Sequence, residues 1–286
     1  MTKEELVKKG EKELADSQRA LLLYMLLYDE DKTKYIKTRK KTEENERVVR
    51  YLDAIRMVKQ GAPVQLAAGR CYFYENSFFV NQSTLIPRFD TETLIDEVLK
   101  YRYPTKKKVS ILDLCSGTGC IGLTLLKQYK EGRVLLCDVS QDALSLSYEN
   151  AKELSVQDRT EFRKLDLLSG RIPEGTFDII TMNPPYIKSG ELYSLEDEVK
   201  CFEPISALDG GEDGLLFYRA FFNRCKSLFS RESIAFLEIG YDLGESVPKL
   251  AREQGFEVLN IALDMDDHPR VVVLTYQDSK REGEEK

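Results

Sequence analysis

A glycine-rich turn and an acidic residue that follows it form the first group of residues with a possible chemistry. The chain reads Cys115-Ser116-Gly117-Thr118-Gly119-Cys120-Ile121-Gly122 directly after the apolar stretch Val109–Leu114. Glycines at these spacings allow a tight turn and let the backbone approach a ligand at the start of a helix. Asp138 stands 19 residues after Gly119, where its carboxylate can accept hydrogen bonds from both hydroxyls of a ribose. This pattern predicts a site for an adenosine-type ligand, lined by Gly117, Thr118, Gly119, Cys120, Ile121 and Asp138.

Other carboxylates help to choose between an S-adenosylmethionine site and a dinucleotide site. Asp113 comes just before the turn, where it can meet the amino group of the methionine part or hold the loop. Asp166 and Leu167 follow the expected strand Thr160–Lys164 and would lie near the adenine amino group; capping of a turn or helix is the other interpretation of Asp166. An NAD-dependent dehydrogenase would use the same glycines and Asp138, so a nicotinamide cofactor stays open at this point.

The segment Asn183-Pro184-Pro185-Tyr186 follows the apolar stretch Phe177–Met182. Two consecutive prolines restrict φ and remove two backbone donors. Such a rigid turn can direct the Asn183 side-chain amide and the Pro184 carbonyl toward one point beyond the end of a strand. Two acceptors that converge there suit a planar –NH2 group, and Tyr186 offers a ring face for stacking. A dehydrogenase would not need this segment; an ordinary end of a strand is the alternative interpretation.

Apolar stretches alternate with helical patterns from about Leu94 onward, which predicts a largely parallel β-sheet covered by helices on both faces. The last two strands have no helix between them, so one of them should run antiparallel. The expected fold class is therefore α/β, with a Rossmann-like seven-stranded sheet and an antiparallel last strand. The expected strands are 109–114, 134–137, 160–164, 177–182, 234–239, 256–262 and 271–276, and the expected helices are 91–101, 120–129, 142–154, 215–229 and 244–254.

The N-terminal part of the chain has a different character, with helical patterns over 4–15, 17–28 and 43–60. We expect a small helical domain at 1–69, a linking β-hairpin at 70–84 whose strands flank residues 75–77, and the domain with the site at 85–286. The run Lys32–Lys41 holds six basic residues and no acidic one. We interpret it as a solvated loop and helix end, with a patch for nucleic acid or another acidic partner as the alternative. We expect the tail 278–286 to be frayed.

Composition excludes several kinds of site. Among 286 residues there is one histidine, His268, and no tryptophan, so we expect no metal and no histidine-based acid–base chemistry. The six cysteines include no Cys-x-x-Cys pair and are interpreted as small buried apolar residues. The longest apolar run, Ala20–Tyr28, is too short to cross a bilayer, and the N-terminus lacks a secretory signal. We therefore expect a cytoplasmic location without membrane contact.

The glycine turn and the Asn-Pro-Pro-Tyr segment together resemble the amino-methyltransferases that modify amide or exocyclic nitrogens with S-adenosylmethionine. Longer motifs resemble the bacterial release-factor glutamine methyltransferase family, over nearly the whole chain. These motifs are Leu85–Glu92, Asn183–Ile187, Phe202–Pro204, Ala207–Gly211, Asp213–Leu215 and Leu237–Gly240. The chain departs from the family pattern at Phe89, where proline is usual, at Glu75, where glycine is usual, and around Gln65–Gly69.

The resemblance implies a methyltransferase sheet and a defined reaction. A methyl group would pass from S-adenosylmethionine, leaving S-adenosylhomocysteine, to the side-chain nitrogen N5 of the glutamine in a Gly-Gly-Gln motif of peptide chain release factors. Asn183, Pro184 and Tyr186 would be catalytic, with Pro185 and Arg88 also on the substrate side. Asn183 would also be one of the cofactor-binding residues. The N-terminal helices would dock the substrate protein, and we expect a monomer.

Two other functions are open to the sequence. A nucleic-acid N-methyltransferase could use the same turn on the exocyclic amino group of a flipped base. The net charge of −7 and the lack of a large basic face beyond Lys32–Lys41 are unfavourable for it. A non-catalytic binding protein that uses the N-terminal helices as an adaptor is the other possibility, which the presence of Asn183 disfavours.

Overall fold

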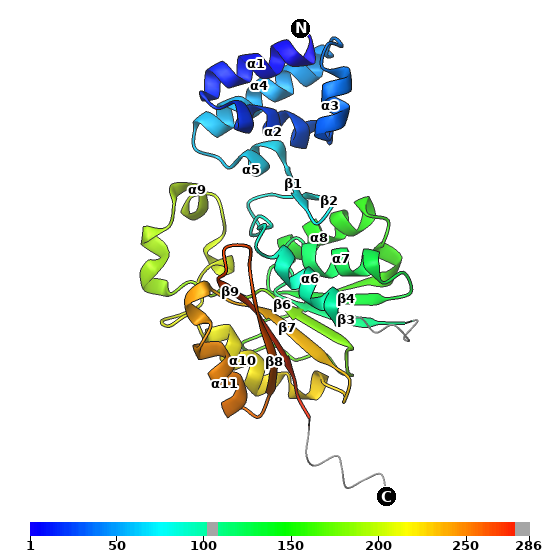
Figure 1. The fold of residues 1–286 in the computed structure, drawn as a ribbon, viewed down its shortest axis with the longest axis vertical. Helices are drawn as coiled ribbons and strands as arrows, with labels where there is room; N and C mark the ends of the chain where they lie inside the picture. The colour runs from blue at the N-terminus through cyan, green and yellow to red at the C-terminus, as the bar shows by residue number, and fades with distance from the viewer. Residues whose placement is uncertain (102–107, 278–286) are drawn as a thin grey trace, which may run out of the picture. The chain divides into compact units, whose positions relative to one another are not determined.

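The computed structural model describes residues 1–101 and 108–277, and the expectation for the tail 278–286 lies outside them. The chain forms two compact units (Figure 1). The first comprises Met1–Ile86 together with Leu195–Pro204, and the second comprises Pro87–Ser194 together with Ile205–Lys286. The first unit thus includes Leu195–Pro204, a short segment far from the rest of the unit in the sequence. A division of the chain into consecutive stretches would not place this segment there.

Helices build most of the first unit. They are α1 (Lys3–Leu14), α2 (Ser17–Tyr28), α3 (Lys32–Thr38), α4 (Asn45–Lys59) and α5 (Val64–Ala68), with the short α9 (Asp197–Lys200) added by the later segment. Thr2 begins α1 with a capping box, in which its hydroxyl accepts from the Glu5 N–H and the Glu5 carboxylate accepts from the Thr2 N–H. The side chain of Asp16 caps α2 in a similar way. The apolar faces of these helices enclose a core that includes Leu23, Tyr24 and Tyr51.

The expected loop at the basic run is wrong in part, because residues 32–38 form the helix α3. Asp31 caps this helix by accepting from the Lys34 N–H at 2.7 Å, and Tyr35 anchors it in the core. One buried ring on a short capped helix is too weak a periodic signal to recognise in the sequence. The expectation of solvation is correct for its lysines, which are exposed at positions 32, 34, 37, 40 and 41.

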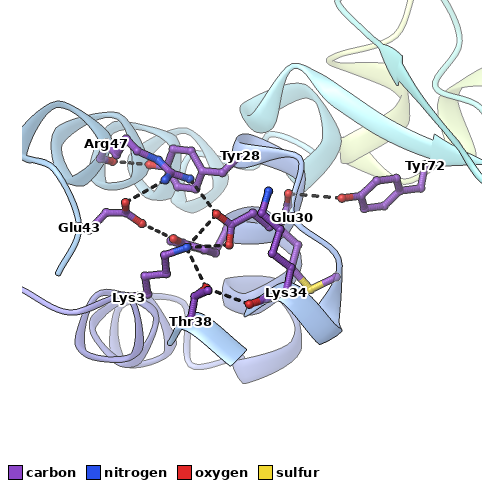
Figure 2. Close-up of polar contacts among 10 residues, drawn as sticks. Lys3, Tyr28, Glu30, Lys34, Thr38, Glu43, Arg47 and Tyr72 are labelled. Carbon is purple, nitrogen blue, oxygen red and sulfur yellow. Dashed lines mark hydrogen bonds and ion pairs between the residues drawn. The ribbon is translucent and has the colours of Figure 1, made fainter. Parts of the chain in front are cut away.

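Buried charges tie α1 to the chain that follows α2 (Figure 2). Lys3 Nζ donates to both carboxylate oxygens of Glu30, at 2.8 and 2.9 Å, and to Thr38 Oγ1 at 3.0 Å. Arg47 approaches Glu30 at 3.4 Å and Glu43 at 2.9 Å. Burial alone would raise the pKa of Glu30, but the hydrogen bond and charge of Lys3, followed by those of Arg47, keep it below its usual value. Charges removed from water in this way stabilise the unit only while each keeps its partners.

The β-hairpin of the first unit pairs β1 (Arg70–Phe73) with β2 (Asn76–Phe79). Its turn is Tyr74-Glu75 and not the expected 75–77, because Phe73 lies opposite Asn76. Both turn residues have positive φ, 44° and 65°, which a two-residue turn needs in order to match the twist of the strands. Position 75 therefore favours glycine, and Glu75 occupies it without that freedom.

A seven-stranded sheet forms the centre of the second unit, in the order β5-β4-β3-β6-β7-β9-β8. All neighbours pair in parallel except β9, which is antiparallel to both β7 and β8, so the expected antiparallel last strand is confirmed. The strands are β3 (Ser110–Leu114), β4 (Arg133–Asp138), β5 (Thr160–Lys164), β6 (Ile179–Met182), β7 (Ile234–Glu238), β8 (Glu257–Leu263) and β9 (Pro269–Thr275).

Helices cover both faces of this sheet, with α10 and α11 on the face opposite α6 and α7 (Figure 1). The helices are α6 (Glu92–Lys100), α7 (Cys120–Gln128), α8 (Gln141–Glu153), α10 (Leu216–Arg224) and α11 (Ser246–Glu253). Helix α10 is shorter than the expected 215–229, since Lys226–Leu228 form a separate 3-10 turn. Leu112, Leu114, Ile180 and Met182 alternate along β3 and β6 toward the aromatic core that includes Phe221 of α10. Among the described residues no helix is long and apolar enough to span a membrane.

Replacing Lys3 by methionine tests the buried ion pair. The variant Lys3→Met would leave Glu30 buried with Arg47 as its remaining charged partner. We expect a loss of about 3 kcal/mol of unfolding free energy, measured by urea denaturation with far-UV circular dichroism. Lys8→Met is the control on the same helix, because Lys8 pairs with Glu4 at the surface and should change stability by less than about 0.5 kcal/mol. Equal effects of both variants would contradict a stabilising role for the buried pair.

Candidate active site

The register of the parallel strands brings the predicted site residues to one edge of the sheet. Leu114 of β3 lies opposite Cys137 of β4 and Met182 of β6, and Met182 lies opposite Leu237 of β7. The residues one step further along these four strands therefore share a row at the carboxyl edge, where ligands bind in open α/β sheets. This row consists of Cys115, Asp138, Asn183 and Glu238.

The glycine turn has the backbone that a tight approach to a ligand requires. Gly117 and Gly119 have φ of 52° and 78°, and Cys115 also lies in the left-handed region at 57°. Gly119 is the N-cap of α7. A Cβ at Gly122 would come within 2.5 Å of a methyl of Leu136, so this glycine lets α7 pack closely against β4. The buried Ser116 Oγ, at the start of the turn, has no hydrogen-bond partner among the described residues.

Asp113, near the end of β3, fixes this turn by hydrogen bonds. It is fully buried, and its Oδ2 accepts from the Gly122 N–H at 3.0 Å while Oδ1 accepts from the Thr181 hydroxyl at 2.7 Å. Burial raises the pKa of Asp113 to about 7, against the lowering effect of these two hydrogen bonds. Two roles were predicted for Asp113: contact with the amino group of the methionine part, or holding the loop. Both hydrogen bonds join Asp113 to neighbouring parts of the protein, which is the second role.

Asp138 connects the end of β4 to the same turn. Its Oδ2 accepts from the Gly117 N–H at 2.8 Å and its Oδ1 accepts from the Ser140 N–H at 2.9 Å. Each carboxylate oxygen can accept a second hydrogen bond, so Asp138 keeps acceptor capacity beside the glycine turn. Burial raises the pKa of Asp138, and the backbone donors oppose this effect.

Asp166 follows β5 and caps its own turn. Its carboxylate accepts from the Leu168 N–H at 2.9 Å and from the Ser169 hydroxyl, and these hydrogen bonds lower its pKa. The capping interpretation of Asp166 thus has direct geometric support, and a contact with adenine stays a prediction. Leu167 is buried next to it, and its carbonyl accepts from Arg224 of α10.

A later segment of the same unit clamps the Asn183–Tyr186 turn. Just beyond the turn, the Ile187 N–H donates to the Leu208 carbonyl at 3.0 Å, and the Gly210 N–H donates to the Ile187 carbonyl at 2.8 Å. The second hydrogen bond brings Gly210 so close that a Cβ there would lie 2.6 Å from Tyr186 Cα. Pro184 and Pro185 are buried, while Asn183 and Tyr186 are partly exposed. The backbone of the turn is therefore held from outside, because its prolines cannot donate hydrogen bonds.

Several polar residues around the turn were not predicted from the sequence. Asn183 Nδ2 donates to Thr91 Oγ1 at 3.4 Å, and the Tyr186 hydroxyl donates to Glu238 Oε1 at 3.4 Å. Arg270 pairs with Asp264 and Asp90 nearby. The pairing of β7 with β6 and with β9 brings Glu238 and Arg270 to this place, and the segment before α6 brings Asp90 and Thr91. Because these contacts join segments distant in the chain, no spacing in the sequence predicts them. Arg88 lies near enough for its charge to lower the pKa of Tyr186.

Comparison with other proteins identifies the family. A family model described as methyltransferase small domain matches residues 88–198. A release factor glutamine methyltransferase of Clostridium acetobutylicum is 37% identical over 261 residues, which are 91% of this chain and 90% of that protein. The chain belongs to the release factor glutamine methyltransferase family.

A second relative agrees with this assignment, and one solved structure shows the same fold. The release factor glutamine methyltransferase of Thermodesulfovibrio yellowstonii is 36% identical over 234 residues, 82% of each chain. The hMettl16 catalytic domain, solved in complex with the MAT2A 3'UTR hairpin 6, superposes with a TM-score of 0.55 over 82% of this chain and 84% of that one. Its 12% identity shows a shared fold alone. The Rossmann-like methyltransferase fold expected from the sequence is thus confirmed.

The close packing of Gly210 against the Asn183–Tyr186 turn can be tested by substitution. A glycine without close neighbours serves as the control for the general effect of replacing a loop glycine by alanine. In Gly210→Ala the new methyl would meet Tyr186 Cα, Tyr186 C and the Pro185 carbonyl oxygen at 2.6 to 2.9 Å, so backbone must move. We expect a loss of about 1–3 kcal/mol of unfolding free energy, measured by chemical denaturation. Gly190→Ala is the control, since nothing lies within 4 Å of a Cβ at that glycine. A Gly210→Ala protein as stable as the control would show that the turn is not clamped.

Proposed function

We propose that this protein transfers a methyl group from S-adenosylmethionine to the side-chain nitrogen N5 of the glutamine in the Gly-Gly-Gln motif of peptide chain release factors. One observation carries the proposal: the glycine turn with Asp138 and the Asn183–Tyr186 turn stand on adjacent strands at one sheet edge. The chain also belongs to a family whose relatives bear the name of this reaction.

The residues at the glycine turn fit S-adenosylmethionine. The turn offers a cradle that positive-φ glycines make possible, a carboxylate with spare acceptor capacity at Asp138, and an unpartnered buried hydroxyl at Ser116. We assign the nucleoside side to Gly117–Ile121, Asp138, Asp166 and Leu167, and we infer that Asp113 acts by holding the turn. When bound, S-adenosylmethionine supplies an electrophilic methyl group.

On the substrate side, Asn183 and Pro184 would bind the glutamine amide. The lone pair of an amide nitrogen is delocalised, which makes it a poor nucleophile. Acceptance of both N–H bonds by Asn183 Oδ1 and the Pro184 carbonyl would orient that nitrogen and stabilise the positive charge that develops on it. Tyr186, with Pro185 and Arg88 beside it, would complete the pocket wall. After transfer the nitrogen would release one of its two protons to solvent, because an amide that carries a positive charge is strongly acidic. Positioning then accounts for most of the catalysis, and no general base with a tuned pKa is required.

The helical first unit is our candidate for docking the substrate protein, because a three-residue motif offers little surface for recognition. Release factors act on ribosomes, so the proposed substrate implies a reaction in the cytoplasm. We further infer that the protein works as a monomer and that its substrate is a protein, not a nucleic acid.

The direct test is a transfer assay. We expect label from methyl-tritiated S-adenosylmethionine to appear in an intact release factor and not in its Gly-Gly-Glu variant, which differs by one amide at the acceptor. Total RNA and genomic DNA serve as the parallel substrates. Labelling of nucleic acid with none in the release factor would overturn the proposal in favour of a nucleic-acid methyltransferase.

Two substitutions should separate cofactor binding from transfer. Asn183→Ala removes one acceptor for the substrate amide, and we expect transfer to fall by about 100- to 1,000-fold with affinity for S-adenosylmethionine unchanged. Asp138→Ala removes the charged acceptor at the glycine turn, and calorimetry should show affinity weakened by about 10- to 100-fold. The exposed Asp158 provides the control Asp158→Ala, which should alter neither quantity. Full transfer by Asn183→Ala, or full affinity in Asp138→Ala, would refute the respective assignment.

A further inference from the structure

An asparagine side chain has two ends of nearly equal shape and opposite hydrogen-bonding character. For the proposed transfer, Asn183 must present its oxygen to the substrate, because an N–H group there would repel the amide that it has to bind. We propose, on the basis of the proposed function, that Thr91 and Glu238 are positioning residues that select this orientation of Asn183.

Hydrogen bonds connect these residues in one chain. Asn183 Nδ2 donates to Thr91 Oγ1 at 3.4 Å. The Thr91 hydroxyl lies close enough to the Glu238 carboxyl to lower the pKa of that carboxyl by hydrogen bonding, and the same carboxyl accepts from the Tyr186 hydroxyl at 3.4 Å. The hydrogen bonds donated by Asn183 and by Tyr186 are long, as is common in active sites before substrate binds.

The direction of each hydrogen bond follows from the charge at Glu238. An ionised carboxylate can only accept, so Thr91 must give it its single hydroxyl proton. Thr91 Oγ1 can then only accept from Asn183, and only the amide –NH2 of Asn183 can donate. Burial, followed by the charge of Glu238, raises the pKa of Tyr186, so its hydroxyl also remains a donor. The ionised state of Glu238 thus turns the Asn183 oxygen away from Thr91.

Glu238 is buried, and its Oε2 has no hydrogen-bond partner among the described residues. This burial raises its pKa to about 7, while the Thr91 hydrogen bond, the charge of Arg270 from β9 and the Tyr186 hydrogen bond act in the lowering direction. Asp90, which precedes α6, acts with the burial. Tyr218 of α10 donates to the backbone carbonyl of Glu238 at 2.7 Å, so it offers nothing to the carboxylate.

The sign of the pH effect follows from these groups. Above the pKa of Glu238 the carboxylate accepts, and the Asn183 oxygen is available for substrate. Below it the protonated carboxyl can donate to Thr91, which frees the Thr91 proton to bind the Asn183 oxygen and lets the amide turn. The rate of transfer should therefore fall as the pH drops through the pKa of Glu238.

The first experiment removes the relay hydroxyl without changing side-chain shape. Thr91→Val should lower kcat for release-factor methylation by about 10- to 100-fold and leave the KM for S-adenosylmethionine nearly unchanged. Thr91→Ser restores the hydroxyl and should recover most of the rate. Thr93→Val is the matched control two residues along, and it should keep kcat within about twofold of the wild type. Calorimetric binding of S-adenosylmethionine shows that each variant is folded.

The second experiment is the pH profile of kcat. The wild type should lose activity below about pH 7, and Glu238→Gln, which cannot change charge, should lack this acidic limb. Asp113 has a similarly raised pKa, so an acidic limb that persists in Glu238→Gln would assign the effect to another group and overturn the role of Glu238.

The outcomes separate the two proposals. Wild-type protein that fails to methylate the release factor refutes the proposed function, and the positioning role falls with it. Active wild type with a Thr91→Val variant of near-normal kcat refutes the positioning role alone. A raised KM for S-adenosylmethionine in Thr91→Val, with kcat unchanged, would show instead that Thr91 supports cofactor binding.

Discussion

The parallel register of β4, β3, β6 and β7 is the constraint on which the functional end of this protein depends. It brings the residues after four separate strands into one row, although they are up to 123 positions apart in the chain, from Cys115 to Glu238. A slip of two residues at any of these pairings would keep the apolar faces buried and yet separate the glycine turn from the Asn183 turn. Burial of the apolar faces alone therefore does not place the site; the specific register of these four strands does.

Around this row, backbone segments that lack hydrogen bonds of their own are held by hydrogen bonds from neighbouring segments or side chains. Pro184 and Pro185 have no N–H to donate, and the Leu208–Gly210 segment supplies hydrogen bonds just beyond them instead. Asp113 acts similarly at the glycine turn, because its carboxylate accepts a hydrogen bond from the Gly122 N–H at the start of α7. Two carboxylates with raised pKa values, Asp113 and Asp138, therefore hold the backbone of the site. The groups that we propose to bind the substrate amide are neutral hydrogen-bond acceptors.

Much of the fold and of the candidate site could be predicted because it depends on local sequence patterns. Alternating apolar stretches predicted the seven strands and the antiparallel last one, and the proline pair predicted a rigid turn at Asn183. The prediction failed where a local signal was weak: α3 depends on one aspartate cap and on the burial of Tyr35, and the hairpin turn falls at Tyr74-Glu75 without any glycine. In both places the surrounding packing compensates for an unfavourable or ambiguous sequence.

The sequence by itself determined the fold class, the family and the identity of the glycine and Asn-Pro-Pro-Tyr turns, since these depend on residue types at short spacings. Only the tertiary structure decided that Asn183 meets Thr91 and Tyr186 meets Glu238, that Gly210 packs on Tyr186, and that Lys3 is buried against Glu30. Each of these contacts joins segments distant in the chain, and their geometry comes from strand register and helix packing. A single sequence records such contacts only as isolated polar or glycine residues, whose function no periodicity reveals.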